Sequence, residues 1–282
     1  MKNISISSII LFLAIQHIQA QVWTLPENGY YISASFSTAT YTQAYDSANI
    51  NYSLYPVEIE DLSLQLQVQY GITDKITVSA KIPYEVQAAK YIGKQQLDSA
   101  GAYIEGELAY LSNIEAGVIY KFRNAKPVIS TSLFIETNTQ DHNFLNGLAT
   151  GYDAWSFKPG IGAGYTINKF WFSAYTAADI KTNNYSSGIL ANGEAGYKLI
   201  DEIYFALFVA GRRSFENGDY CSCYLTNSGL FFNDQSYIAY TGKAGFLFNE
   251  FSLNFGYTGA YPGRNIPGDP VFTVGFAYKK EK

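Results

Sequence analysis

Apolar and polar residues alternate strictly along residues 61–84, in two runs separated by a short polar turn. The apolar positions are Leu62, Leu64, Leu66, Val68 and Tyr70 in the first run and Ile76, Val78, Ala80, Ile82 and Tyr84 in the second. Side chains of a β-strand point to opposite faces at successive residues. The segment is therefore predicted to form a β-hairpin with one apolar face and one polar face.

The same alternation recurs along the chain and predicts about twelve antiparallel strands. Short turns are expected at residues 71–75, 123–126, 168–169, 200–202 and 249–250. Long connections are expected at residues 41–60, 85–111, 139–154, 181–187, 214–235 and 262–270. This pattern is typical of an all-β, transmembrane up-and-down β-barrel with short periplasmic turns and long extracellular loops. Residues 85–111 contain an alternation of their own, so about fourteen strands is the alternative count.

The first twenty residues have the features of a secretory signal peptide. Lys2 precedes an apolar run at residues 4–15, and a short polar stretch ends at Ala20. The apolar run is shorter than the roughly 20 residues that a membrane-spanning helix needs. We therefore expect cleavage after Ala20 and a single barrel domain at residues 21–282. Because the first strand begins soon after residue 21, no plug domain is expected.

Composition agrees with a barrel. Aromatic residues make up 17% of the chain, and 25 residues are tyrosine, which suits two interfacial girdles. The net charge of −5 gives no basic stripe for nucleic acid. A periplasmic β-sandwich or jelly roll would share the aromatics and the alternation, but the repeated hairpins favour the barrel. The expected location is the outer membrane of a diderm bacterium, with both termini in the periplasm, lipid around the wall and insertion by the barrel-assembly machinery.

One motif carries a family resemblance. It consists of Tyr70, Gly71, Ile72 and Thr73, a charged turn, an apolar strand, and then Pro83 and Tyr84. Together with residues 22–37 and 113–122, it resembles outer-membrane barrels associated with phenol and toluene degradation (the MetA-pathway type) and their transporter-like relatives. The family has a glycine and an acidic residue where this chain has Ser112 and Asn113. The resemblance implies a passive channel for small, aromatic or apolar solutes.

Charged residues are predicted on the inner face of eight consecutive strands. They are Lys81, Glu115, Glu136, Lys158, Asp179, Glu194, Arg212 and Lys243. Four are basic and four acidic, whereas a charge-selective pore would favour one sign. One interpretation is a mixed-charge constriction that orients a polar solute. The other is that opposite charges pair and fill a narrow lumen, which suits the alternative function of a non-conducting barrel whose outer loops bind a partner or surface polymer.

Other candidate chemistry is sparse. His142, the one histidine of residues 21–282, adjoins Asp141 in an outer loop, but no serine motif accompanies this pair. We therefore expect no enzymatic activity and no cofactor. Two groups of carboxylates are placed in outer loops, where solvated charge is the expected role and no metal site is predicted. They are Glu58, Glu60 and Asp61, and Glu105 and Glu107.

Two further motifs are interpreted structurally. Cys221 and Cys223, the only cysteines, lie in a long outer loop, and an oxidising compartment would allow a disulfide between them. Metal binding or an intermolecular bond remain the alternatives. The run GIGAGY at residues 160–165 resembles a phosphate-binding loop, but no helix follows it. Its glycines are expected on the inner face of a strand, where they make room in the lumen or permit curvature.

Overall fold

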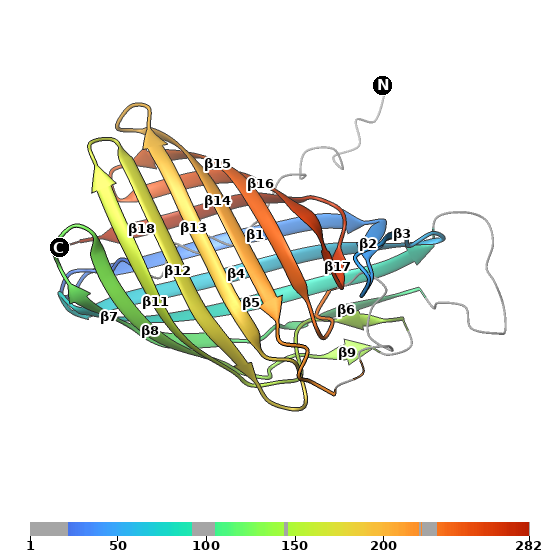
Figure 1. The fold of residues 1–282 in the computed structure, drawn as a ribbon. Coiled ribbons are helices and arrows are strands. Elements are labelled where there is room, and N and C mark those ends of the chain that lie inside the picture. Colours follow the sequence, from blue (N-terminus) through green and yellow to red (C-terminus); the bar gives the residue numbers. More distant parts are fainter. Residues whose placement is uncertain (1–21, 92–104, 144–145, 220, 222–229, 282) are drawn as a thin grey trace, which may run out of the picture.

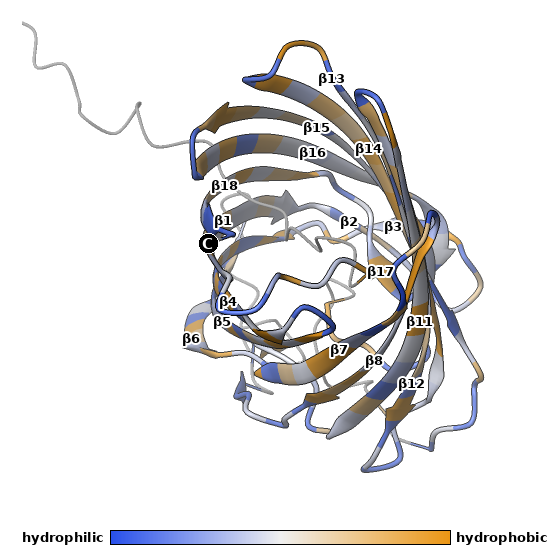
Figure 2. Ribbon diagram, turned by 90° about the vertical axis from the view of Figure 1, so that its left-hand side faces the viewer, coloured by the Kyte–Doolittle hydropathy of each residue, from blue (hydrophilic) through white to orange (hydrophobic). Residues whose placement is uncertain are grey.

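A computed structural model of the chain describes residues 22–91, 105–143, 146–219, 221 and 230–281. Its main element is a β-barrel whose strands run obliquely around the lumen (Figures 1 and 2). The described residues contain no helix long and apolar enough to cross a membrane.

Twelve strands close into a ring within the described part of the chain. They are β1 (Tyr30–Tyr41), β4 (Val57–Thr73), β5 (Ile76–Tyr91), β7 (Glu115–Arg123), β8 (Val128–Glu136), β11 (Ser156–Ile167), β12 (Phe170–Lys181), β13 (Gly188–Lys198), β14 (Ile203–Ser214), β15 (Ser236–Phe248), β16 (Phe251–Arg264) and β18 (Val271–Lys280). Every neighbouring pair is antiparallel. The first and last strands close the ring, with Tyr30 opposite Lys280 and Thr38 opposite Phe272. The predicted count of twelve strands is confirmed.

Residues 85–111, which favoured the alternative count of fourteen strands, do not add a pair of strands to the ring. β6 (Gly106–Leu111) pairs with residues 84–89 of β5, whereas β7 pairs with residues 76–81 of the same strand. The predicted strand from Ser112 is therefore interrupted before Glu115. Asn113 holds this interruption, because its Nδ2 donates to the carbonyls of Thr137 and Tyr152, both at 2.7 Å.

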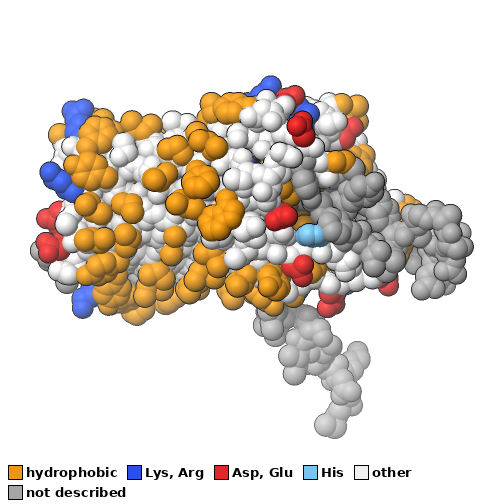
Figure 3. All heavy atoms as spheres, turned by 90° about the horizontal axis from the view of Figure 1, so that it is seen from below, with side chains coloured by type: hydrophobic (Ala, Val, Ile, Leu, Met, Phe, Trp, Pro, Cys, Tyr) orange, Lys and Arg blue, Asp and Glu red, His pale blue; other side chains and the backbone are white. Residues whose placement is uncertain are grey.

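The two faces of the wall differ as the alternation predicts. In β4, Leu64, Leu66 and Val68 point outward and stay exposed, while Ser63, Gln65, Gln67 and Gln69 are buried inside. The outer surface carries a broad band of hydrophobic side chains, with most charged side chains toward its two ends (Figure 3). Only a closed barrel can satisfy all backbone hydrogen bonds in lipid, so this band is suited to a hydrocarbon core.

The short turns lie together at the end of the barrel where the chain terminates (Figure 1). Asn168 and Asn249 have positive φ values of 51° and 53°, as tight hairpin turns require. Aromatic rings lie near this end, for example Tyr278 with centroids 5.7 Å from Tyr30 and 4.9 Å from Phe251. They occupy the place of an interfacial girdle.

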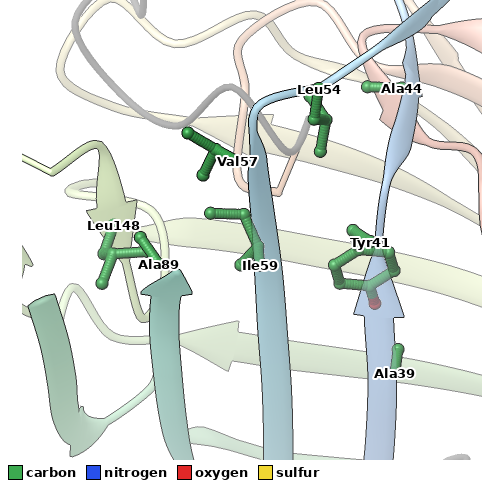
Figure 4. Packing of buried hydrophobic residues seen from close by; sticks show 8 residues of the cluster. All are labelled: Ala39, Tyr41, Ala44, Leu54, Val57, Ile59, Ala89 and Leu148. Atoms are coloured by element: carbon green, nitrogen blue, oxygen red, sulfur yellow. The ribbon is translucent and has the colours of Figure 1, made fainter. Parts of the chain in front are cut away.

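The opposite end carries a small cap, formed by short strands above the ring. These are β2 (Gln43–Tyr45), β3 (Asn51–Ser53) and β17 (Ile266–Pro267) in one sheet and β9 (His142–Asn143) and β10 (Leu148–Ala149) in another. Beneath them lies a buried apolar cluster that includes Tyr41, Leu54, Val57, Ile59 and Leu148 (Figure 4). At the end of the barrel opposite the short turns, the cluster packs residues of β1, β4 and β5 against Leu148 of β10.

Candidate functional site

The candidate site is the lumen, and the structure places all eight predicted charged residues on its wall. Their side chains form three separate networks of opposite charge. In the first, Glu115 pairs with the Lys81 Nζ at 2.6 Å and accepts a hydrogen bond from the Lys158 Nζ at 2.9 Å. Lys158 also bonds Glu136. This network joins β5, β7, β8 and β11.

The other two networks each span three strands. Arg212 of β14 pairs with Asp179 of β12, donates to the Ser186 carbonyl at 3.0 Å, and lies over β13. Lys243 of β15 pairs with Glu194 of β13 at 2.7 Å and lies 4.6 Å from the ring centroid of Phe208 in β14.

The paired geometry has an energetic consequence. The side chains of the eight residues are at most 16% exposed, so each charge depends on its partner rather than on bulk water. Removing one partner of a buried pair leaves an uncompensated charge, which is strongly destabilising. These eight residues therefore form neutralised pairs rather than a ring of like charge of the kind that selects ions.

The opposite side of the lumen is polar and mostly neutral. β1, β4, β16 and β18 present serine, glutamine, asparagine and threonine inward, and the charged exceptions are Asp61 of β4 and Lys279 at the end of β18. Among the residues that the structure describes, Gln67 Oε1, Asn254 Oδ1 and Thr273 Oγ1 are buried there without a hydrogen-bond partner. Buried polar atoms are normally satisfied by protein or ordered water. This side of the lumen is therefore suited to water or a polar solute.

Residues 22–29, which precede β1, fold into the lumen, and the alternation does not predict this. Val22 is fully buried, and the Ser130 Oγ donates to its carbonyl at 2.5 Å. The Leu25 amide donates to the Thr77 Oγ1 at 2.8 Å. We call residues 22–29 the N-terminal segment. It is a short occupant rather than a plug domain, and the amides of Glu27 and Asn28 also donate to Asp74 Oδ1 and the Gly71 carbonyl.

Glycines of β11 make room for this segment, as predicted for the GIGAGY run. A Cβ added at Gly162 would lie 2.6 Å from Val22 Cγ2, and one at Gly164 would lie 2.5 Å from Trp23 Cζ2. In the sequence, these inward glycines indicate where the lumen has space. The alternation of apolar and polar residues does not indicate which part of the chain fills that space.

A cavity of about 330 Å³ remains beside the N-terminal segment, at the end with the short turns. Its lining includes Trp23 from the segment and Tyr31, Trp171, Tyr204, Lys243 and Asn254 from the wall. The indole Nε1 of Trp171 donates to Glu194 Oε1 at 2.8 Å, so the third charge network forms part of the cavity wall. Ligand pockets typically combine aromatic surfaces with a few placed polar groups.

The opposite mouth is also aromatic. The ring of Tyr152 lies edge-on to Tyr185 and Phe231, with centroids 5.6 Å away in both cases. The Lys181 Nζ lies 3.2 Å from the centroid of the Tyr152 ring. Burial raises the pKa of the Tyr152 hydroxyl above its usual value, so this phenol is neutral at physiological pH.

The predicted outer-loop carboxylates need a correction. β4 begins at Val57, so Glu58, Glu60 and Asp61 belong to a strand rather than a loop. Asp61 points inward, is 8% exposed, and accepts from Gln87 Nε2 at 3.2 Å. Exposed Glu60 pairs with Lys90 at 2.5 Å. Glu107 likewise lies in a strand, β6. The described residues contain no group of three or more histidine, cysteine or acidic residues placed to hold a metal ion.

The remaining candidates lie at the end of the barrel opposite the short turns. His142 is in β9, and its backbone amide donates to Asp141 Oδ1 at 2.8 Å. Cys221 is exposed, whereas Cys223 lies outside the described residues, and their disulfide stays a prediction.

No protein-family model and no curated protein matches the chain. Solved structures do match. The COG4313 outer membrane channel from Pseudomonas putida F1 has 11% identity and a TM-score of 0.69, over 95% of this chain and 100% of that one. The translocator domain of autotransporter NalP from Neisseria meningitidis has 12% identity and a TM-score of 0.50, over 90% of each chain. These likenesses show that the chain has the fold of outer-membrane β-barrels.

Proposed function

We propose that the protein is a passive outer-membrane pore for small solutes, including aromatic ones, and that the N-terminal segment controls its opening. The observation that carries this proposal is the lumen. It contains a cavity lined by aromatic and polar side chains, next to a short chain segment that lies outside the strands and whose residues 22–27 are joined to the wall by hydrogen bonds with Ser130, Thr77 and Asp74. Such a segment can move without unfolding the wall.

The route through the lumen has three stages. A solute from outside meets the aromatic mouth at Tyr152 and the apolar cluster of the cap. It then passes between the charge networks and the neutral side, and finally reaches the cavity beside Trp23. Apolar constrictions can gate a pore by excluding water, and the cap cluster could act in this way together with the N-terminal segment.

Planar-bilayer recording tests the proposal directly. The full-length protein should give small, intermittent conductance steps, and a variant lacking residues 22–27 should give larger and steadier ones. Liposomes containing that variant should swell in small sugars and amino acids. If the shortened barrel folds, as shown by heat-modifiable mobility, and neither conducts nor permits swelling, the pore proposal is wrong.

A second candidate is a non-conducting barrel whose outer loops bind a partner or surface polymer. The filled charge networks favour it, because Lys158 contacts both Glu115 and Glu136 within the lumen. The same recordings separate the two functions. A shortened variant that stays silent would leave this candidate as the explanation.

We further propose the outer membrane as the location, with the short turns and both termini toward the periplasm and insertion by the barrel-assembly machinery. The hydrophobic outer band and the fold support this placement (Figure 3). We also propose that residues 1–20 are removed on export. Amino-terminal sequencing of the membrane form tests the cleavage, and protease shaving of whole cells tests the orientation. Cleavage restricted to the short turns would reverse the orientation.

A further inference from the structure

The cavity beside the N-terminal segment has features that select a ligand class. Aromatic side chains supply much of its lining. Trp171 and Tyr204 lie edge to face with centroids 5.7 Å apart, and Tyr31 is 2% exposed. Glu194 anchors the indole of Trp171 through a 2.8 Å hydrogen bond. Because these rings are fixed by their neighbours, they present preformed surfaces to a planar ring.

The charged groups of the lining favour an anion. Three lysines and one glutamate contribute, namely Lys198, Lys243, Lys279 and Glu194. Glu194 is engaged on both oxygens, by Trp171 and by Lys243. Lys279 pairs with Glu281 in the terminal stretch, whereas Lys198 has no ion pair among the described residues. The lining therefore has an excess of positive charge.

A third feature is an unsatisfied amide. Asn254 is 1% exposed, lines the cavity, and has no hydrogen-bond partner for Oδ1 within the described structure. A buried acceptor without a partner costs free energy unless water or a ligand donates to it. A hydroxyl substituent on a bound ring could supply this hydrogen bond.

We propose that the cavity binds small aromatic carboxylates, and most tightly those that carry a ring hydroxyl. The ring lies against the tryptophan and tyrosine side chains, the carboxylate lies toward Lys198 and Lys243, and the hydroxyl donates to Asn254. The volume of about 330 Å³ is at the small end of ligand pockets, which suits a single ring. The inference rests on the proposed function for its biological meaning, since it names the solute class of that pore.

Intrinsic fluorescence can test the proposal. The chain has three tryptophans, and Trp23 and Trp171 line the cavity while Trp155 is 42% exposed at the other end. A Trp155→Phe protein therefore reports mainly on the cavity. It would be titrated with 4-hydroxybenzoate, benzoate, benzyl alcohol and benzylamine. We expect saturable quenching by both carboxylates, strongest with 4-hydroxybenzoate, and at least about tenfold weaker binding of the alcohol and the amine.

Three variants assign the contacts. Lys198→Met and the double variant Glu194→Gln with Lys243→Met should each weaken benzoate binding. Asn254→Leu should remove the preference for 4-hydroxybenzoate over benzoate. Lys75→Met is the matched control, because Lys75 is an exposed lysine at the same end and outside the cavity. If the double variant fails to fold, Lys198→Met at the cavity mouth still decides the role of charge.

The outcomes separate this inference from the pore. Equal binding of benzyl alcohol and benzoate, or no saturable quenching by any of them, would overturn the aromatic-carboxylate site even in a conducting barrel. Saturable carboxylate binding by a barrel that never conducts would keep the site and reject the pore.

Discussion

Gly162 of β11 lies directly against Val22 of the N-terminal segment, where an added Cβ would come within 2.6 Å of Val22 Cγ2. A larger side chain at this position should therefore expel the segment. We predict that Gly162→Leu raises the conductance and makes Val22 accessible to labelling when it is replaced by cysteine. Gly242→Leu is the control, because a Cβ at Gly242 would meet nothing within 4 Å. Equal conductance in the two variants would contradict the prediction.

The hydrogen bonds that hold the N-terminal segment should set how often it leaves. The Ser130 hydroxyl and the Thr77 hydroxyl each bond its backbone. Ser130→Ala and Thr77→Val each remove one bond, worth about 1 kcal/mol. We expect more frequent opening in bilayer recordings for each variant and a larger effect for the double variant. Unchanged open probability in the double variant would show that these two hydrogen bonds do not control the segment.

The central carboxylate of the first charge network should be needed for stability and ion preference. Glu115→Gln leaves Lys81 and Lys158 without their shared partner, and such losses cost about 3–5 kcal/mol in buried pairs. Urea unfolding measured by heat-modifiable mobility would test the stability. Reversal potentials should shift toward anion preference. Glu60→Gln is the control, since the Glu60–Lys90 pair is about half exposed and such pairs contribute about 0–1 kcal/mol.

The ion pair between Arg264 and Glu216 should make the protease sensitivity of residues 214–219 depend on pH. Arg264 hydrogen-bonds Glu216 and holds the pKa of that carboxyl below its usual value. A depressed pKa stabilises the folded arrangement above the ordinary glutamate pKa, and this stabilisation is lost as the pH falls through the lowered value. We expect residues 214–219 to become more protease-sensitive only at strongly acid pH. A Glu216→Gln protein should be sensitive already at neutral pH; if it stays as resistant as the parent, the pair does not restrain the loop.

The sequence predicted the wall well because strand geometry has a strict period of two. Within each strand, the apolar residues identify the outward face. The residues between them, such as Gln65, Gln67, Glu115 and Asp179, therefore face the lumen. The pairing partners were less predictable, because Arg212 and Asp179 lie on strands separated by β13. Such contacts depend on side-chain length and barrel curvature, which alternation does not encode.

Two misplacements have physical reasons. The N-terminal segment was missed because residues 22–29 have no periodic pattern and are held by tertiary contacts alone. Glu58, Glu60 and Asp61 lie close together and predict a solvated loop, although Val57 and Ile59 alternate with the two glutamates. Three carboxylates within four residues indicate a solvent-exposed segment only when all of them lie on the same face. In a strand, Asp61 and Glu60 point to opposite faces.

The unequal strand lengths make one side of the barrel taller than the other. β4 and β5 have 17 and 16 residues, whereas β7 and β8 have 9 each. At about 3.3 Å per residue, the long strands reach roughly 25 Å further along their own direction. The taller side would stand clear of the surrounding surface. In the proposed orientation, an antibody or a phage arriving from the medium should therefore meet the ends of β4 and β5 first, and tags inserted near β3 should be the most accessible on intact cells.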